Sequence, residues 1–530
     1  MRRRTKILIG ILAGIIVIAG IGVVVGLRTL EPRLHKWVSD TLSRSLESEI
    51  QLGAVHLNWV PLRLHARDLT VRHHGRTDIP PLLVVSSFTL DLRPTDLWSS
   101  TVDRVTVDGL EINIPPKDLD TGKRPLPNPS SGNASADAGD ASSGDKKPGG
   151  LVIRHLLAKN TRMAIVPREQ GKNAKVWDIF ELDMKNLRAN EAATFTAALI
   201  NPIPYGKIEA AGTFGPWQSS SPGSSALSGE YTFAADLGTI DGLAGQLGAS
   251  GAMGGTIEQI STRGETHTPD FKLTELNGRT LPLNTSYDAI VDGTKGDVEL
   301  KRVDITLGAS KMQAKGVVEG TKGIKGKRVV VNLTSKSTDL GELLQFVSKA
   351  GPPPADGILI IDAAMDLPQG KAPVLDRVSL QGSVRAEQVR FAKDTVQDKI
   401  DELSRRGQGR PSDASIDDVA SQMATTFTLK RGVFTYKGLS FNVQGARIQL
   451  AGTHSLKSKA VDLKGVVLLN ATVSNTMTGY KSWLLKPFDP LFRKNGAGTR
   501  LVITVAGTQD QPKVGVDIGR TLKGKKPNEP

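Results

Sequence analysis

The amino-acid sequence predicts a mainly β protein, in which an N-terminal transmembrane helix is followed by a long antiparallel β-sheet and a few short helices. Three observations predict this fold class: one long apolar run near the N-terminus, alternation of apolar and polar residues through most of the chain, and glycine where alternating segments begin or turn. Hydrophobic residues make up 38% and aromatic residues 5% of the 530 residues. This is lean for a compact core of that size and favours an elongated sheet.

The first predicted element is the apolar run, residues 7–27, which contains no charged residue. At 1.5 Å per residue a helix of this length crosses about 30 Å of hydrocarbon. Residues 1–6 are rich in arginine and lysine, so the positive-inside rule predicts that this end stays in the cytoplasm and that the chain after Leu27 lies outside. A cleavable signal peptide has a shorter apolar core and a small-residue cleavage site, so we expect residues 7–27 to be a retained anchor.

The segment after the anchor, residues 32–48, predicts an amphipathic helix. It begins with Pro32, which is favoured in the first turn of a helix. One face collects the apolar residues Leu34, Trp37, Val38, Leu42 and Leu46. This face either caps the open end of the following sheet or lies on the lipid surface.

Short strands with a period of two complete the first region, residues 28–117. Polar or glycine-containing turns separate them, so the pattern predicts a meander. The alternating residues are Leu62 and Leu64, then Phe88, Leu90 and Leu92, then Val105 and Val107, then Leu110, Ile112 and Ile114.

Two segments lack core-forming residues. Residues 118–150 are rich in Pro, Gly, Ser, Asp and Ala, and they cannot bury enough surface to offset the entropy lost on ordering. We expect a disordered linker or loop there, which divides the chain without necessarily dividing a domain. Residues 521–530 predict a basic flexible tail.

From residue 151 to residue 520 the alternation continues in recurrent hairpin-like units. The last unit pairs residues 501–505 with residues 514–518 across a glycine- and proline-containing turn. The preceding stretch, residues 493–500 (RKNGAGTR), is basic and glycine-rich. A phosphate-binding loop requires GxxxxGK[ST] and a following helix, whereas a strand follows here. We therefore expect a repeating sheet over residues 151–520.

Helical periodicity after the linker is confined to four short segments. They are residues 338–350, residues 396–406, residues 414–426, whose start carries Asp417 and Asp418, and residues 476–485. We expect these helices to decorate or plug the sheet.

The composition excludes several classes of site. The chain has no cysteine, which excludes disulfide scaffolds, thiol catalysis and Cys-ligated metal sites. The net charge of +14 favours anionic partners. The Lys and Arg residues are nevertheless scattered, without the aromatic-interleaved basic stripe of nucleic-acid-binding proteins, so we expect no nucleic acid partner.

Catalytic or metal-binding patterns are sparse. The adjacent His73 and His74 lie in a predicted turn and have no acidic partners at a definite spacing. Residues 292–297 (DGTKGD) resemble half of a calcium loop but lack its ligand order, and they predict a hairpin turn. We expect neither an enzyme activity nor a cofactor.

Several segments together resemble the AsmA-like family of Gram-negative envelope proteins. Besides the anchor, the helix and the first strands, they are GTFGPW (212–217), YDAIVDGTKGDVEL (287–300), LSRRGQG (403–409), LSFNVQGARIQLAGTHSL (439–456) and DPLFRKNGAGTRLVITVAGTQDQPKVGVDI (489–518). The family is similar to chorein-type bridge-like lipid-transfer proteins. The resemblance implies a chorein-like start in residues 28–117 and, over residues 151–520, a long curved antiparallel sheet that forms an apolar groove.

The residues alone leave two architectures open for such a sheet. A sheet with one apolar face must cover it with another layer, close into a barrel, or present it to an apolar ligand. The predicted helices are too few to cover it, so an open groove competes with a stack of β-sandwiches. The residues expected to face lipid in a groove are Leu90, Leu92, Val105, Val107, Ile112, Ile114, Phe441, Val443, Ile448 and Leu450.

The resemblance also implies a function. It suggests a single-pass inner-membrane protein, anchored by residues 7–27 with its bulk in the periplasm, that binds phospholipid or another acyl lipid. Such a protein supports lipid transport towards the outer membrane and envelope homeostasis. The alternatives are a non-transporting scaffold for outer-membrane protein assembly, working with envelope partner proteins, and an envelope hydrolase.

Overall fold

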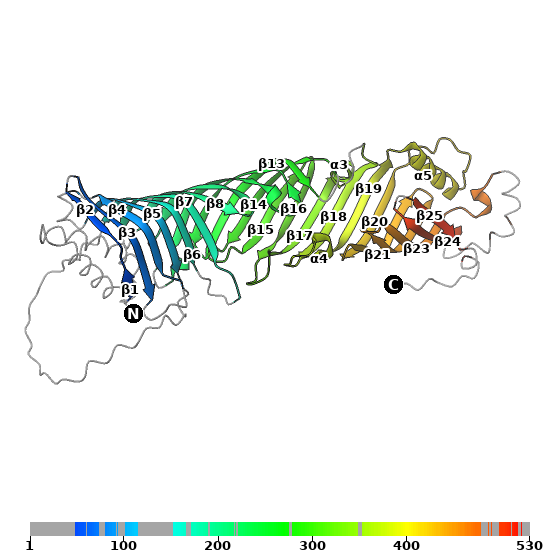
Figure 1. Ribbon diagram of the computed structural model, residues 1–530. Coiled ribbons are helices and arrows are strands. Elements are labelled where there is room, and N and C mark those ends of the chain that lie inside the picture. Colours follow the sequence, from blue (N-terminus) through cyan, green and yellow to red (C-terminus); the bar gives the residue numbers. More distant parts are fainter. Residues whose placement is uncertain are drawn as a thin grey trace, which may run out of the picture. The chain divides into compact units, whose positions relative to one another are not determined.

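The computed structural model describes residues 48–59, 61–73, 80–91, 93, 101–114, 152–165, 171–188, 191–216, 218, 221–274, 278–347, 352–478, 486, 489, 498–509, 511–517 and 521. Within this part the chain is mainly β with few helices, as predicted (Figure 1). The predicted anchor, the linker and nearly all of the amphipathic helix and the tail lie outside the described residues. No helix in the described part is long and apolar enough to span a membrane.

The chain divides into two compact units. Unit 1 contains the residues up to Ala234 together with Ser250–Thr262 and Ile290–Asp297. Unit 2 contains Ala235–Ala249, Arg263–Ala289 and the residues from Val298 onward.

Unit 1 is a sheet built mainly from the first strands of the chain. These strands are β1 (Ser48–Gln51), β2 (Val55–Trp59), β3 (Leu62–His73), β4 (Leu83–Asp91), β5 (Thr101–Ile114), β6 (Val152–Ile165), β7 (Lys175–Arg188), β8 (Ala193–Pro202), β9 (Tyr205–Phe214) and most of β10 (Ala226–Asp236). The short 3-10 helix η3 (Pro222–Ser224) precedes β10. Parts of β12 (Gln246–Thr256) and β13 (Gln259–Leu273) also belong to unit 1. The predicted meander is therefore present, although Ser48, expected at the end of a helix, begins a strand.

One strand pair of unit 1 departs from the predicted antiparallel order. β1 and β2 both pair antiparallel with β3, and the pairs from β3 to β5 and from β6 to β9 are antiparallel. β5 and β6 instead run parallel, with Thr101 opposite Val152 and Ile114 opposite Ile165. A parallel pair needs a crossover of a dozen or more residues rather than a hairpin, and residues 115–151 supply that length.

One face of the unit 1 sheet is buried. A single cross-strand row from β3 to β8 shows this, because every member is at most 9% exposed. The row consists of Leu64, Leu90, Val105, Leu156, Met184 and Phe195. Ile257, in the turn between β12 and β13, packs against Ile114 and Ile165, so a segment distant in sequence closes over part of this face.

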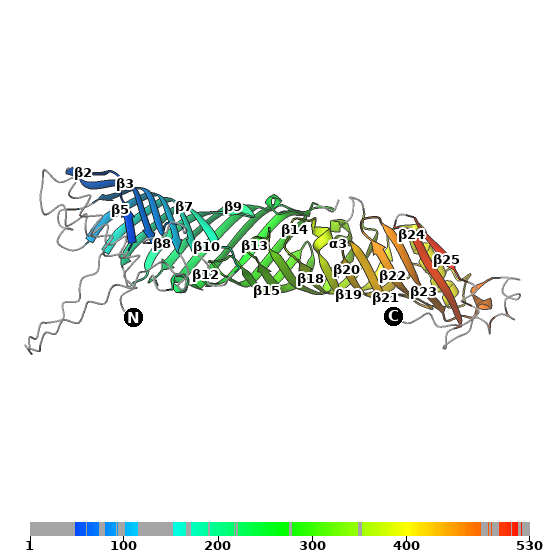
Figure 2. The same ribbon diagram turned by 60° about the horizontal axis from the view of Figure 1, so that its bottom comes forward.

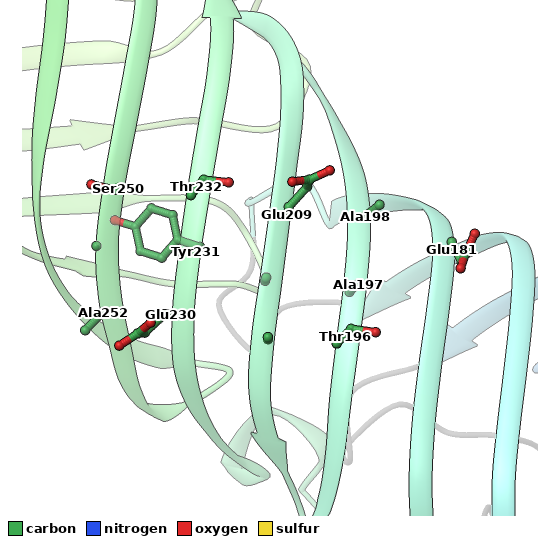
Figure 3. A pocket seen from close by; sticks show the side chains of 13 residues that line it. Glu181, Thr196, Ala197, Ala198, Glu209, Glu230, Tyr231, Thr232, Ser250 and Ala252 are labelled. Atoms are coloured by element: carbon green, nitrogen blue, oxygen red, sulfur yellow. The ribbon is translucent and has the colours of Figure 1, made fainter.

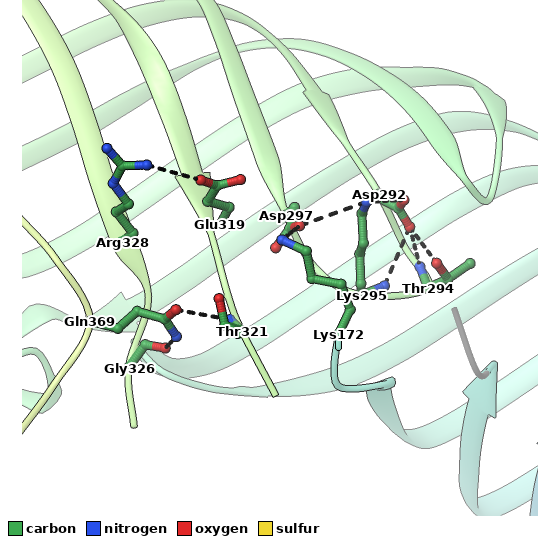
Figure 4. A network of polar contacts seen from close by, with 10 residues as sticks. All are labelled: Lys172, Asp292, Thr294, Lys295, Asp297, Glu319, Thr321, Gly326, Arg328 and Gln369. Atoms are coloured by element: carbon green, nitrogen blue, oxygen red, sulfur yellow. Dashed lines mark hydrogen bonds and ion pairs between the residues drawn. The ribbon is translucent and has the colours of Figure 1, made fainter. Parts of the chain in front are cut away.

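A second turn closes over the same sheet at β7. The Trp177 indole Nε1 donates a hydrogen bond to the Gly293 carbonyl oxygen at 2.8 Å, and the Lys172 ammonium pairs with Asp297 at 3.0 Å. Asp292 fixes the turn, since its carboxylate accepts from the Thr294 amide and hydroxyl (Figure 4). Residues 292–297 therefore form a turn after β14 (Leu281–Val291), as predicted, and the turn belongs to unit 1.

Unit 2 continues as a meander of consecutive antiparallel strands (Figures 1 and 2). It contains the remaining parts of β10, β12, β13 and β14, the 3-10 helix η4 (Leu237–Thr239) and β11 (Leu243–Ala244), which pairs with β13. Its main strands are β15 (Val298–Leu307), β16 (Ser310–Glu319), β17 (Arg328–Asp339), β18 (Ala355–Leu367), β19 (Ser379–Phe391), β20 (Ser421–Lys430), β21 (Val433–Val443), β22 (Ala446–Ser455), β23 (Ala460–Leu469), β24 (Thr499–Thr508) and β25 (Gln511–Val516). Each pairs antiparallel with the next, including the predicted last pair.

The helices of unit 2 lie at the margins of this sheet. α3 (Leu340–Val347) follows β17 and α5 (Asp394–Gly407) follows β19, so both lie at one margin, as Figure 1 shows. The short α4 (Val374–Arg377) follows β18 and lies at the opposite margin. The predicted helices at 338–350 and 396–406 are confirmed as α3 and α5. The fourth prediction, 476–485, falls mostly on residues 479–485, which are outside the described part. Of its described residues, only Thr476 is helical, as the last residue of the 3-10 helix η5 (Ser474–Thr476).

The predicted helix at 414–426 is wrong. Residues from Ser421 form strand β20, and Asp418 has a positive φ of 49°. The buried Asp401 carboxylate of α5 accepts from the amides of Asp418 at 3.2 Å and Val419 at 2.9 Å, which holds this stretch in a non-helical path. Pairing with β19 then recruits the following residues, because tertiary context overrides a weak local helix preference.

Candidate functional site

The sheet of unit 2 has two chemically different sides, which strand register separates. One row crosses all strands from β15 to β25 and contains apolar residues, glycine and one tyrosine. It consists of Val303, Ala314, Leu333, Ala363, Gly382, Phe427, Tyr436, Gly452, Leu463, Val505 and Val514. We call the side of the sheet that carries this row the apolar face of unit 2.

A second row, displaced by one residue along each strand, carries its side chains on the other side of the sheet and is mostly polar. From β16 to β25 it consists of Lys315, Asn332, Ala364, Gln381, Thr428, Thr435, Thr453, Asp462, Ala506 and Lys513. The apolar face, by contrast, carries no Asp, Glu, Lys or Arg on any described residue of β15 to β25. Successive side chains of a strand alternate between faces, so this separation follows directly from the period-two sequence pattern.

The apolar face is covered at one margin. Leu340 of α3 is buried in a cluster with Leu359 and Val389. Ile400 and Leu403 of α5 pack against a second cluster, formed by Val443, Ala446 and Leu469. These two helices therefore bury the ends of the strands that lie beneath them.

The middle of the apolar face is only half-buried. Leu333, Phe427, Tyr436 and Leu450 all have intermediate exposure, and Val514 in the last strand is 68% exposed. Beyond neighbouring strands, the elements that pack most extensively on this sheet are α3 and α5. Ala314 and Leu463 in this row are buried, but large apolar side chains that stay partly exposed on several strands are unusual for a protein core, because a core packs its apolar face against a second layer.

Glycines within the apolar face let neighbouring strands approach closely. A Cβ atom at Gly382 would lie 2.2 Å from the Asp362 carbonyl oxygen, and one at Gly452 would lie 2.1 Å from the Asp462 carbonyl oxygen. Gly452 also has a φ of 150°, which disfavours other residues. These positions exclude larger residues because of the strand geometry.

An aromatic cluster occupies the apolar face at β20 and β21. The rings of Phe434 and Tyr436 stack with centroids 5.9 Å apart, and Phe427 meets Phe434 edge-on at 5.7 Å. Burial raises the pKa of the Tyr436 hydroxyl above its usual value of 10.0. His454 lies opposite Phe434, and its Nε2 atom is buried without a hydrogen-bond partner.

The predicted lipid-facing residues fall into three groups. Leu90, Val105, Val107 and Ile114 are buried in unit 1, and Ile112 packs against the same clusters. Phe441, Ile448 and Leu450 are half-buried on the apolar face of unit 2, whereas Val443 is 9% exposed beneath α5. Leu92 lies outside the described residues. Thus the two sets belong to different units and differ in how far they are covered.

The sequence did not identify the half-exposed positions on β15 to β20. Leu333, Met365 and Val384 belong to strands that the pattern predicted, and their parity already placed them with the other apolar residues. The sequence does not show which strands the helices cover, because that depends on the tertiary contacts of α3 and α5.

Unit 1 also has a hollow of about 680 Å³ on the side opposite to its buried face (Figure 3). Glu181, Ala198 and Glu209 stand in one cross-strand row there. The two glutamates are exposed, and Glu230 adds a third carboxylate. The remaining lining is largely Ala, Gly, Ser and Thr. Among the described residues, no group of three or more acidic or histidine side chains could hold a metal ion. Its three carboxylates make this hollow unsuited to acyl chains, which would have to desolvate them.

Comparisons with known proteins identify no relative. No family model matches the chain, and neither the curated proteins nor the solved structures include a significant match.

Proposed function

We propose that the protein binds acyl lipid along the apolar face of unit 2 and supports lipid transport between membranes. In this proposal it is an AsmA-like protein, anchored in the inner membrane by residues 7–27, that works in the periplasm and is not an enzyme. The observation that carries the proposal is a face free of Asp, Glu, Lys and Arg from β15 to β25, half-exposed at its middle.

The energetic argument concerns the exposed apolar surface. Burying apolar area contributes about 25 cal/mol per Å², which corresponds to about 0.8 kcal/mol for each methylene group. A long hydrocarbon chain laid on Leu333, Phe427 and Leu450 would gain this term, as would the face itself. Its polar headgroup can remain in water because the middle of the face is not covered.

The length of the face favours a ligand that moves along it or several ligands side by side. Adjacent strands lie about 4.8 Å apart, so the row from Val303 to Val514 extends over about 48 Å along the sheet. No charged side chain interrupts the row. An acyl chain moving along it would therefore meet no position at which it had to desolvate an ion.

The test is the lipid content of the purified full-length protein. Lipids are extracted and quantified by mass spectrometry from the wild type and from Leu450→Asp, which places a carboxylate on the half-exposed apolar face. The matched control is Gln449→Asp, the neighbouring position on the exposed other side of β22. We expect bound acyl lipid in the wild type and the control, and a loss of at least about tenfold in Leu450→Asp, because an ion in an apolar contact costs several kcal/mol.

A wild-type protein free of acyl lipid would contradict the proposal and would favour a non-transporting scaffold. Equal lipid content in folded Leu450→Asp and Gln449→Asp would show that the lipid lies elsewhere. Retention of structure is checked for both variants by circular dichroism.

A further inference from the structure

The turns at one margin of unit 2 are strongly basic. Because β15 to β25 form a meander, alternate connections lie at the same margin, and those after β16, β18, β20 and β22 share the margin that carries α4. They are residues 320–327, 368–378, 431–432 and 456–459. Eight basic residues lie in these turns, namely Lys322, Lys325, Lys327, Lys371, Arg377, Arg431, Lys457 and Lys459, against one acidic residue, Asp376.

The opposite margin has the reverse balance. Its described connections are residues 308–309, 340–347, 352–354, 392–420, 444–445, 470–478, 486, 489 and 498. They contain six basic residues, Lys393, Lys399, Arg405, Arg406, Arg410 and Lys486, and nine acidic residues, Glu342, Asp394, Asp398, Asp401, Glu402, Asp413, Asp417, Asp418 and Asp489. The positive charge is therefore concentrated at one margin of the unit and is not a general property of its surface.

The basic turns are held in place by contacts with one another. Gln369 donates to the Gly326 carbonyl at 2.6 Å and accepts from the Thr321 amide at 2.9 Å (Figure 4). The Gly370 amide donates to the Lys325 carbonyl at 3.1 Å. Lys457 pairs with Asp376, so a third turn is joined to the α4 turn. The cations thus stand on a continuous, ordered edge.

Nearby acidic groups on the strands do not neutralise the first turn. Asp366 and Glu319 both pair with Arg328, at 2.8 Å and 3.6 Å. The Lys322, Lys325 and Lys371 side chains are exposed and carry their charge at the turn itself. Their charge is therefore available to an external anion.

Exposed aliphatic side chains accompany these cations. Ile324 lies between Lys322 and Lys325 and is 48% exposed, while Leu456 in a further turn and Val433, the first residue of β21, are each 37% exposed. Soluble polyanions are recognised by charge alone, whereas a lipid bilayer offers anionic headgroups and an apolar layer just beneath them. The combination of lysine and an exposed aliphatic side chain in these turns matches the bilayer.

We propose that this basic margin docks on an anionic lipid bilayer surface. The lysines of the turns lie among the headgroups, and Ile324, Val433 and Leu456 enter the outer edge of the hydrocarbon. This surface is separate from the apolar face, so the proposal does not depend on lipid being bound there.

The test uses the full-length protein held in nanodiscs of phosphatidylcholine. Its binding to separate vesicles is measured by flotation, with vesicles of phosphatidylcholine alone and of phosphatidylcholine with phosphatidylglycerol. We expect binding to the anionic vesicles only, weakening as salt shortens the screening length from about 10 Å at 0.1 M to about 3 Å at 1 M. The triple variant Lys322→Gln, Lys325→Gln, Lys371→Gln should bind about 100-fold more weakly, given the typical contribution of each lysine near such a surface.

The matched control removes the same charge from the strands. Lys301→Gln, Lys311→Gln, Lys315→Gln changes exposed lysines of β15 and β16 that lie outside the turns, and it should lower the affinity by less than about threefold. Equal weakening by the two triple variants, or equal binding to neutral vesicles, would overturn the proposal.

A single variant separates the bilayer from a soluble polyanion. Ile324→Asp should weaken binding to anionic vesicles at least about tenfold, because it replaces the inserted side chain with a repelled charge. Two results together would instead assign the margin to a soluble polyanion. Soluble polyphosphate would abolish binding to the vesicles, and Ile324→Ser would bind the vesicles as tightly as the wild type. Lipid bound on the apolar face is measured in the same preparations and should be unchanged.

Discussion

The two units use the same strand pattern to produce two different apolar faces. In unit 1 the row from Leu64 to Phe195 is at most 9% exposed, and distant turns around Ile257 and Gly293 pack over parts of the sheet. In unit 2 Leu333 and Phe427 of the apolar row are half-buried, and α3 and α5 cover one margin. Alternation therefore determines which side of a strand is apolar, whereas the connections determine whether that side becomes a core or a binding surface.

The largest predicted effect is the difference in stability between placing a charge on the apolar face of unit 1 and placing one on the apolar face of unit 2. Val105 is 1% exposed, so Val105→Asp buries a carboxylate without a partner and should cost several kcal/mol, a large part of the 5–15 kcal/mol that stabilises a typical domain. Leu450→Asp can hydrate at its half-exposed position and should cost no more than about 1–3 kcal/mol. Thermal unfolding followed by circular dichroism checks both values. Equal destabilisation would mean that the face of unit 2 is also a closed core.

The same contrast between the two faces changes how a substitution at Val443 is interpreted. This residue was predicted to face lipid, but it packs beneath α5 with Ala446 and Leu469. A carboxylate there would report on the packing of α5 as well as on lipid. Leu450 lies four residues along β22 from Ala446, the partner of Val443, and is therefore the cleaner site for the lipid experiment.

The second prediction concerns the parallel pair of unit 1. Ile114 ends β5 at the far end from Val152, which begins β6, so the connection must return over about 43 Å, the length of thirteen strand steps. Deleting residues 119–145 leaves ten connecting residues, which reach at most about 36 Å. This deletion should abolish the β5–β6 pairing and the cooperative unfolding of unit 1.

A shorter deletion is the control. Removing residues 128–145 leaves nineteen connecting residues, which reach more than about 60 Å, so the midpoint of thermal unfolding should change by only a few degrees. Hydrogen exchange of the amides of β6 reads out the pairing directly. Native protection in the longer deletion would show that the two strands do not need a crossover of this length.

The smallest predicted effect concerns Tyr436. Burial raises the pKa of its hydroxyl in the folded protein above 10.0, so the contribution of the neutral side chain to stability is complete below pH 10 and is lost as pH rises through the folded-state pKa. The wild type should therefore lose more thermal stability between pH 9 and pH 11 than Tyr436→Phe, by about 1 kcal/mol or less. A difference between the two proteins that does not depend on pH would contradict the burial of this hydroxyl.

The sequence predicts the strands better than it predicts their environment. Leu90 and Leu450 have the same alternation, yet one is fully buried and the other half-exposed, because closure by a distant turn leaves no local trace. The parallel pairing of β5 with β6 was missed for a related reason, since strand direction depends on the path of a linker with no structural pattern of its own. The helix at 414–426 was predicted from local periodicity, but hydrogen bonds to Asp401 and pairing with β19 determine the structure there.

Site-specific photo-crosslinking tests the central claim most directly. A photoreactive amino acid is placed in the full-length protein at Leu333, on the apolar face of unit 2, at the neighbouring Asn332 on the polar side, and at Val105 in the core of unit 1. After irradiation of cells that express the protein, acyl-lipid adducts are identified by mass spectrometry. The account predicts lipid adducts at Leu333 and only background at Asn332 and Val105. Equal adducts at Leu333 and Asn332, or adducts at Val105 and none at Leu333, would contradict it.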